Sequence, residues 1–309
     1  MPPPSRDRSQ QDVLASALER FGLRLSDGAS PADARSGAGV HRVGLTGGGR
    51  AYLKVTAADV GRSRAEAERE LRFYRGVAPA APVSTPALLD VLILDEGVAL
   101  LLEDAGEQLA VTAWSRDRWR LLGRELARLH GMPLPAGDWG RADDLLSALA
   151  VSDLGPVVEF WSGHLPQLDD LLEGRTAVVD RLRTVPSVFV HGDCHTGNVV
   201  HEQAGGHDTP VFCDWQAAGI GRATSDLALL SVRATPSGAR VPAALVEEYL
   251  ARTARRGGAQ DVDEFRRCLA LEELAILVFQ WPSYAAYNGP AGTARIRRRA
   301  RELAERLSG

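Results

Sequence analysis

The densest group of polar side chains follows a short apolar segment, Val188–Val190. The next eight residues read His-Gly-Asp-Cys-His-Thr-Gly-Asn and occupy positions 191–198. A second apolar segment, Val211–Cys213, is followed at once by Asp214. Alternating or continuous apolar residues in runs this short are typical of strands. Because Asp193 and Asp214 each come just after a predicted strand, we expect both carboxylates to point into one cleft.

Asn198 adds a neutral oxygen ligand five residues after Asp193. One carboxylate and one amide oxygen suit a hard divalent ion such as Mg²⁺. The second carboxylate can then orient a hydroxyl group and accept its proton during attack. Phosphoryl transfer depends mainly on positioning and on neutralising charge, so this small set of side chains is sufficient for that chemistry.

Lysine is almost absent from the chain. The 309 residues include 36 Lys and Arg residues, of which Lys54 is the single lysine. A lysine ammonium is a compact point charge that a forked guanidinium does not reproduce. Composition alone leaves two interpretations open, a position that requires lysine or chance.

The overall composition excludes several classes of protein. With 45% hydrophobic and 25% charged residues and a net charge of −4, the chain is typical of a globular protein. Its apolar runs are shorter than the roughly 18 residues that span a bilayer, so we expect no membrane association. Three cysteines without a disulfide pattern indicate a reducing cytoplasm. A mildly acidic chain is not expected to bind nucleic acid.

The first hundred residues are predicted to form an antiparallel sheet with one internal helix. A Gly-rich turn at 46–49 joins the first two strands. The strands are predicted at 40–45, 51–55, 88–94 and 98–102, with an opening helix at 13–21 and the internal helix at 62–75.

The remainder of the chain is predicted to be mainly helical. Its helices are expected before His130 and at 156–172, 177–182, 242–256, 262–279 and 293–307, and short strands at 188–190, 198–200 and 211–213. The sequence therefore predicts an α+β fold with an N-terminal lobe, residues 1–102, and a C-terminal lobe, residues 103–309.

The motif His-Gly-Asp-x-x-x-x-Asn, followed by a strand ending in Asp-Trp, resembles the aminoglycoside phosphotransferase and choline kinase family. The resemblance implies a two-lobed, protein-kinase-like fold. It also implies that Asp193 is the catalytic base, that Asn198 and Asp214 are metal ligands, and that His191 supports the loop. Asp226, at the start of a helix, would brace the catalytic loop. The family's common Leu and Pro are replaced here by Cys194 and Thr196.

A kinase of this type needs a strand lysine that reaches the phosphates and a helix glutamate that holds it. Lys54 lies in the predicted strand, and the helix offers glutamates at positions 66, 68 and 70. At about 100° per residue, Glu70 lies on the flank of the apolar stripe nearest Tyr74. The sixteen-residue spacing from Lys54 to Glu70 is similar to that in the family. Glu70 is therefore the predicted partner.

Other nucleotide-binding positions rest on weaker patterns. Ser36, Gly37 and Gly39 precede a strand and are expected to cover the phosphates of ATP or GTP with backbone N–H groups. The segment 100–106 resembles the inter-lobe hinge of the family, which implies that backbone groups at Glu103 and Ala105 read the nucleobase.

The remaining polar and aromatic residues admit other interpretations. The His- and Cys-rich segment 191–213 is compatible with a zinc site, although it contains no tight metal-binding pair, so this interpretation is disfavoured. The carboxylates of Glu272 and Glu273 could contact a cationic substrate, but exposed helix charge is the favoured interpretation. The aromatic residues between Trp281 and Tyr287 could line an acceptor pocket, but a place in the core is favoured.

The sequence thus predicts a Mg²⁺-dependent small-molecule O-phosphotransferase that uses ATP or GTP. The expected acceptor is a small hydroxylated antibiotic of aminoglycoside, nucleoside or peptide type. The first alternative is a kinase of a metabolite such as choline, homoserine or a sugar. The second is a nucleotide-binding pseudokinase without catalytic activity. We expect a cytoplasmic monomer or homodimer.

Overall fold

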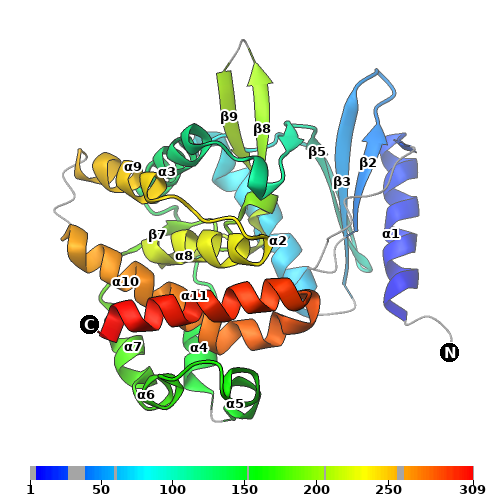
Figure 1. Ribbon diagram of the computed structural model, residues 1–309. Helices are drawn as coiled ribbons and strands as arrows, with labels where there is room; N and C mark the ends of the chain where they lie inside the picture. The colour runs from blue at the N-terminus through cyan, green and yellow to red at the C-terminus, as the bar shows by residue number, and fades with distance from the viewer. Residues whose placement is uncertain are drawn as a thin grey trace.

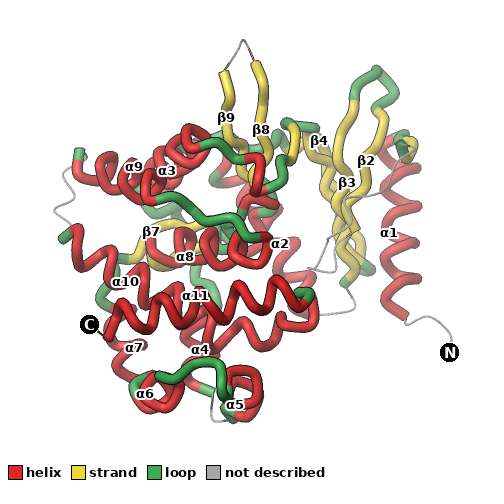
Figure 2. The backbone as a smooth tube through the Cα atoms, viewed as in Figure 1, coloured by secondary structure: helices red, strands yellow, loops and turns green. Residues whose placement is uncertain are grey.

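The computed structural model describes residues 5–26, 39–58, 61–151, 153–204, 207–255 and 261–308. Strands dominate one side of the molecule and helices the other (Figures 1 and 2). The strand-rich side holds a five-stranded antiparallel sheet in the order β1-β2-β3-β5-β4. Its strands are β1 (Arg24–Leu25), β2 (Gly39–Gly44), β3 (Arg50–Ala57), β4 (Leu88–Leu94) and β5 (Gly97–Glu103).

The two faces of this sheet are covered by different helices. Successive strand residues point to opposite faces, so Leu53 and Val55 of β3 face away from Lys54. They pack with Val13 and Ala17 of α1 (Ser5–Phe21), which lies along the outer face (Figure 1). The internal helix α2 (Gly61–Gly76) covers the other face. Lys54 therefore faces α2 and the rest of the molecule.

The helical side contains two apolar cores. One core joins α2 to α3, α8 and α9, and the other joins α4–α7 to α10 and α11. The helices are α3 (Arg116–His130), α4 (Asp144–Ala150), α5 (Gly155–Trp161), α6 (Leu168–Glu173), α7 (Arg175–Arg183), α8 (Ala223–Ala234), α9 (Ala243–Ala254), α10 (Val262–Ala275) and α11 (Pro290–Ser308).

Two small sheets hold the polar segments in place. Strand β7 (Ser187–Val190) pairs antiparallel with β10 (Gly219–Arg222). Strand β8 (Val199–Ala204) pairs with β9 (His207–Phe212) and with β6 (Glu107–Gln108). The segment 191–198 therefore leaves one small sheet and enters the other, and Asp214 lies on the return path between them.

Most predicted elements are present, and three differ in extent or kind. The opening helix begins at Ser5 rather than at residue 13. The predicted helix 156–172 is two helices, α5 and α6, because Gly163 adopts a positive φ of 71° and Pro166 disfavours helical backbone at the residue before it. The predicted helix 262–279 ends at Ala275 and continues as a π-helix, Ile276–Gln280.

Strand β10 was missed from the sequence because its four residues, Gly-Ile-Gly-Arg, carry a single large apolar side chain. Within the described ranges, no helix is long and apolar enough to cross a membrane.

Candidate active site

Lys54 lies at the centre of an ion triad in which the Lys54 and Glu70 side chains are buried and the Asp214 side chain is 27% exposed. Its Nζ atom is 2.6 Å from Oε2 of Glu70 and 2.6 Å from Oδ1 of Asp214. Lys54 and Glu70 are 6% and 1% exposed. Burial alone would lower the pKa of Lys54, but the two carboxylates raise it above its usual range. The ammonium therefore stays charged, and the predicted pairing with Glu70 is present.

The two carboxylates of the triad respond differently to burial. Burial raises the pKa of Glu70, and the neighbouring Asp214 carboxylate adds to that effect against the pull of Lys54. Burial also acts to raise the pKa of Asp214, but Lys54 outweighs it and lowers that pKa below its ordinary value. Asp214 is therefore the carboxylate of the pair that is held as an anion and can bind a cation.

Helix α2 is attached to the second lobe next to Glu70. The Trp215 backbone N–H donates to Oε1 of Glu70 at 3.3 Å, and the Trp215 ring stacks on Phe73 with centroids 3.9 Å apart. Arg69 donates to the carbonyl of Ala218 at 3.0 Å and to that of Gly140 at 2.7 Å. Arg69 carries no recognisable signal in the sequence, because its two acceptors are backbone atoms more than seventy residues away along the chain.

The segment 191–198 is fixed by Asp226, near the start of α8. Its carboxylate accepts hydrogen bonds from the backbone N–H groups of His191 at 2.8 Å and Gly192 at 2.9 Å. The buried His191 ring donates through Nε2 to the carbonyl of Cys213 at 2.8 Å. Both residues are thus placed to brace the loop, as the resemblance implied.

Asp193 and Asn198 lie against each other. The amide Nδ2 of Asn198 donates to the Asp193 carbonyl at 2.9 Å and to Oδ2 of Asp193 at 3.3 Å. The Asp193 side chain is 36% exposed, so its carboxylate is accessible from solvent. Because the amide nitrogen is used within the loop, the amide oxygen of Asn198 is left to bind a cation.

The donor set fits the predicted magnesium. Asn198 and Asp214 contribute hard oxygen atoms, and Oδ2 of Asp214 is not used by Lys54. Mg²⁺ commonly binds one or two protein oxygens and takes its other ligands from water and substrate phosphates. The zinc interpretation gains no support, because the described residues contain no group of three or more His, Cys, Asp or Glu side chains that could hold a metal.

His195 is a second residue beside Asp193 that the sequence analysis did not assign to the site. Its Nε2 lies 3.7 Å from Oδ2 of Asp193 and 3.2 Å from Nη2 of Arg233 on α8. Burial, together with the nearby Arg233 charge, lowers the pKa of His195 to about 4 against the opposing pull of Asp193. The position of His195, two residues after Asp193, could have indicated from the sequence that it lies near the site. No sequence pattern indicates Arg233.

The predicted nucleotide-contacting residues are only partly described. Gly39 begins β2, while Ser36 and Gly37 lie outside the described residues. The backbone N–H of Glu103 donates to the carbonyl of Ala87 at 3.0 Å, so that group is engaged within the lobe. Glu103 and Ala105 line a pocket of about 440 Å³. Their role in reading the base stays a prediction.

Tyr52 is a further residue on the Lys54 face of the sheet that was not predicted from the sequence. It lies two residues before Lys54 in β3 and therefore on the same face of the sheet. Its hydroxyl accepts a hydrogen bond from Arg42 at 2.7 Å. The period-2 pattern of β3 was the signal that could have placed Tyr52 on the same face as Lys54.

The expected exposure of Glu272 and Glu273 is wrong, because both side chains are buried. Arg222 donates to Glu272 at 2.6 Å, and Arg299 donates to Glu273 at 2.7 Å. Burial of a carboxylate is tolerated where such partners neutralise it. Neither carboxylate is free to bind a cationic substrate.

The aromatic residues that follow these glutamates differ in burial. Trp281 belongs to the core, as favoured, but Tyr284 and Tyr287 are 47% and 66% exposed. The core interpretation is therefore wrong for the two tyrosines.

Comparison with known protein families agrees with this arrangement. The sequence profile of the phosphotransferase enzyme family matches residues 33–266, which is more than half of the chain. The chain belongs to the phosphotransferase enzyme family. None of the curated protein sequences compared with it matches.

Several solved structures share the fold of this phosphotransferase family member. The microcompartment-associated aminopropanol kinase is 16% identical with a TM-score of 0.63, and the alignment covers 96% of this chain and 97% of that chain. An ethanolamine kinase from Plasmodium vivax is 11% identical with a TM-score of 0.58, and the alignment covers 95% of this chain and 84% of that chain. An aminoglycoside phosphotransferase from Streptomyces rimosus is 23% identical with a TM-score of 0.53, and the alignment covers 86% of this chain and 97% of that chain. These likenesses confirm the predicted two-lobed, kinase-like α+β fold.

Proposed function

We propose that this phosphotransferase moves the γ-phosphate of a Mg-nucleotide, ATP or GTP, to a hydroxyl group of a small molecule. The observation that supports the proposal is the contact of Lys54 Nζ with both Glu70 and Asp214 at 2.6 Å. The triad holds a cation and a metal-binding carboxylate next to each other, on residues from the two lobes. The proposed lobes are residues 1–102 and 103–309, with the nucleotide between them.

In the proposed reaction, Asp193 orients the acceptor hydroxyl. The hydroxyl oxygen attacks the γ-phosphorus, its proton passes to the Asp193 carboxylate, and the bond to the bridging oxygen of the nucleoside diphosphate breaks. The products are a phosphate monoester and a nucleoside diphosphate. Lys54 neutralises negative charge on the phosphates, which is the main requirement of phosphoryl transfer. Glu70 keeps the ammonium in position.

Asn198 and Asp214 are the residues proposed to hold Mg²⁺. When bound, the ion would supply positive charge that offsets the negative charge developing during phosphoryl transfer. The chain's own part is to present oxygen atoms rather than nitrogen atoms at this point. The Asn198 amide is fixed in that orientation by its two hydrogen bonds to Asp193.

For the acceptor we propose an antibiotic with a free hydroxyl group. Related folds include an aminoglycoside phosphotransferase solved with ADP and streptomycin and an amicoumacin kinase solved with AMP-PNP and Ca²⁺. The second candidate is a small amino alcohol or a related metabolite, which is favoured by the TM-score of 0.63 to the aminopropanol kinase. We further propose a cytoplasmic enzyme that is a monomer or homodimer and binds neither nucleic acid nor membrane.

An acceptor screen tests this proposal. The purified chain is incubated with Mg²⁺, ATP or GTP, and one compound at a time from a panel of aminoglycosides, nucleoside and peptide antibiotics, choline, ethanolamine, homoserine and sugars. Mass spectrometry then detects the gain of one phosphate. The matched control is Asp193→Asn, which leaves the fold and Lys54 in place. We expect the wild type to phosphorylate at least one compound. We expect no phosphorylated product in the samples with Asp193→Asn.

Two results would contradict the proposal. Binding of nucleotide without transfer to any compound would favour the pseudokinase alternative. Failure to bind either nucleotide in the presence of Mg²⁺, measured by calorimetry, would remove the basis for a kinase reaction.

A further inference from the structure

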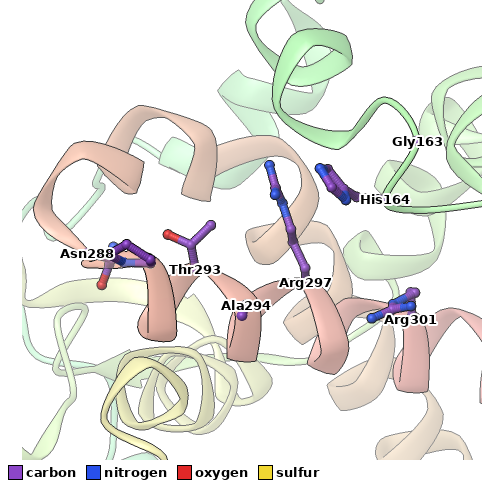
Figure 3. A pocket seen from close by; sticks show the side chains of 8 residues that line it. Gly163, His164, Asn288, Thr293, Ala294, Arg297 and Arg301 are labelled. Carbon is purple, nitrogen blue, oxygen red and sulfur yellow. The ribbon is translucent and has the colours of Figure 1, made fainter.

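A further cavity lies away from the triad, between α11 and the loop that joins α5 to α6. Its volume is about 520 Å³, which is in the range of pockets that bind small molecules. Arg297 extends from α11 toward the loop that carries Gly163 and His164 (Figure 3). The lining residues are Gly163, His164, Asn288, Pro290, Thr293, Ala294, Arg297 and Arg301.

The lining of this cavity is cationic and contains no acidic side chain. The guanidinium groups of Arg297 and Arg301 line the cavity. So do the imidazole of His164 and polar side chains that can donate hydrogen bonds. Among the described residues, no carboxylate forms an ion pair with Arg297 or Arg301. By contrast Arg299, on the same helix, is paired with Glu273 at 2.7 Å.

Arg297 is held in a fixed orientation. Its Nη2 donates to the carbonyl of Phe160 at 3.0 Å, and its guanidinium carbon lies 4.9 Å from the centre of the Phe160 ring. Its Nε atom is buried and has no hydrogen-bond partner among the described residues. Nε itself is closed to solvent and so to a ligand in the cavity. An oxyanion bound in the cavity would supply the negative charge that no described carboxylate provides to Arg297.

The cavity is on the far side of α11 from the catalytic loop. At about 100° per residue, Thr293, Arg297 and Arg301 share one face of α11, and Arg295 lies on the opposite face. Arg295 donates to Pro236 at 2.7 Å, in the 3-10 helix Thr235–Ser237 that follows α8. Arg233, near the end of α8, contacts His195 beside Asp193. The contacts that lead from α11 to the catalytic loop therefore start on the face of α11 that carries Arg295, opposite the cavity.

We infer that this cavity is a separate binding site for the oxyanion group of a small molecule, with Arg297 and Arg301 as its charged ligands. Guanidinium groups bind phosphate and carboxylate through paired N–H donors. The cavity is much larger than a bare phosphate ion, so a phosphate monoester fills it better. The inference stands on the cavity itself and does not depend on the proposed kinase reaction.

Binding of inorganic phosphate and of glucose 6-phosphate to the full chain tests the inference by calorimetry, with sodium chloride at equal ionic strength as the reference. The test variant is Arg301→Gln, because Arg301 is exposed and its removal leaves the core intact. The matched control is Arg298→Gln, which removes the same charge from an exposed residue of α11 outside the cavity. Arg297→Gln is the second test variant.

We expect saturable binding that Arg301→Gln and Arg297→Gln each weaken about tenfold, consistent with loss of one charged hydrogen-bonding group. Arg298→Gln should bind as the wild type does. Tighter binding of glucose 6-phosphate would identify a phosphate monoester as the ligand, and equal binding would identify the free oxyanion. Binding no stronger than that of chloride, or equal binding by Arg301→Gln and the wild type, would overturn the inference.

Discussion

Nζ of Lys54 lies 2.6 Å from Oδ1 of Asp214, although 160 residues separate them in the chain. The contact joins β3 of the sheet lobe to the segment after β9, and Glu70 of α2 completes it. A buried charge is stable only where partners neutralise it. The positions of the sheet, of α2 and of the segment at Asp214 are therefore coupled through one ammonium group.

Lys54→Arg should lower turnover at least about 10²-fold, the usual cost of losing a group that stabilises charge in the transition state. A guanidinium is larger than an ammonium, and the two carboxylates at 2.6 Å leave no room for the fork. Turnover with the acceptor found in the screen measures the loss, and a melting curve shows whether the variant is folded. Near-normal turnover would show that a point charge is not required.

Asp193→Asn should lower phosphate transfer about 10³-fold, because an amide cannot accept the hydroxyl proton. Nucleotide affinity, measured by calorimetry, should stay close to that of the wild type, since Lys54 and Asp214 are unchanged. A variant that lost nucleotide binding and transfer together would indicate a structural role for Asp193 in place of the proposed catalytic one.

Gly192→Ala should lower the free energy of unfolding by about 3 kcal/mol or more. Gly192 has a φ of 84°, and an added Cβ would lie 2.1 Å from the carbonyl oxygen of Ala217. The matched control is Gly137→Ala, where φ is 93° but no atom lies within 4 Å of the added Cβ. The control should lose about 1 kcal/mol, from backbone strain alone. Equal losses in urea unfolding would rule out the close contact as the cause.

Asp226→Asn should lower the free energy of unfolding by about 3 kcal/mol at pH 7, because it removes a buried charge from its partners. Burial acts to raise the pKa of Asp226, but the hydrogen bonds from His130 and from the Gly192 N–H lower it below its ordinary value of 3.8. A carboxyl with a lowered folded-state pKa stabilises the protein above its unfolded-state pKa. That stabilisation is lost as pH falls through the lower, folded-state value.

Urea unfolding of the wild type and of Asp226→Asn between pH 7 and pH 3 measures this effect. The difference between the two proteins should be constant from pH 7 to about pH 5 and should shrink as the pH falls below 3.8. A difference that grew with falling pH would contradict the lowered pKa.

The fold class, the family and the spacing of the chemical groups were all accessible from the amino-acid sequence. A lone lysine on a strand, a glutamate on the flank of an amphipathic helix, and two carboxylates after short apolar runs are local patterns. Strand and helix periodicity translate such patterns directly into faces. The resemblance to the kinase family implied a lysine–glutamate pair, and helix periodicity then selected Glu70 as the partner of Lys54.

Only the tertiary structure decided which partners meet over long separations. Arg69 reaches backbone carbonyls, Arg233 reaches His195, and Glu272 and Glu273 are buried against arginines from other helices. Sequence patterns missed these contacts because a helix charge looks the same whether it faces solvent or a partner that arrives from a distant segment. The cationic cavity on α11 has the same origin, since it exists only where the loop after α5 packs beside that helix.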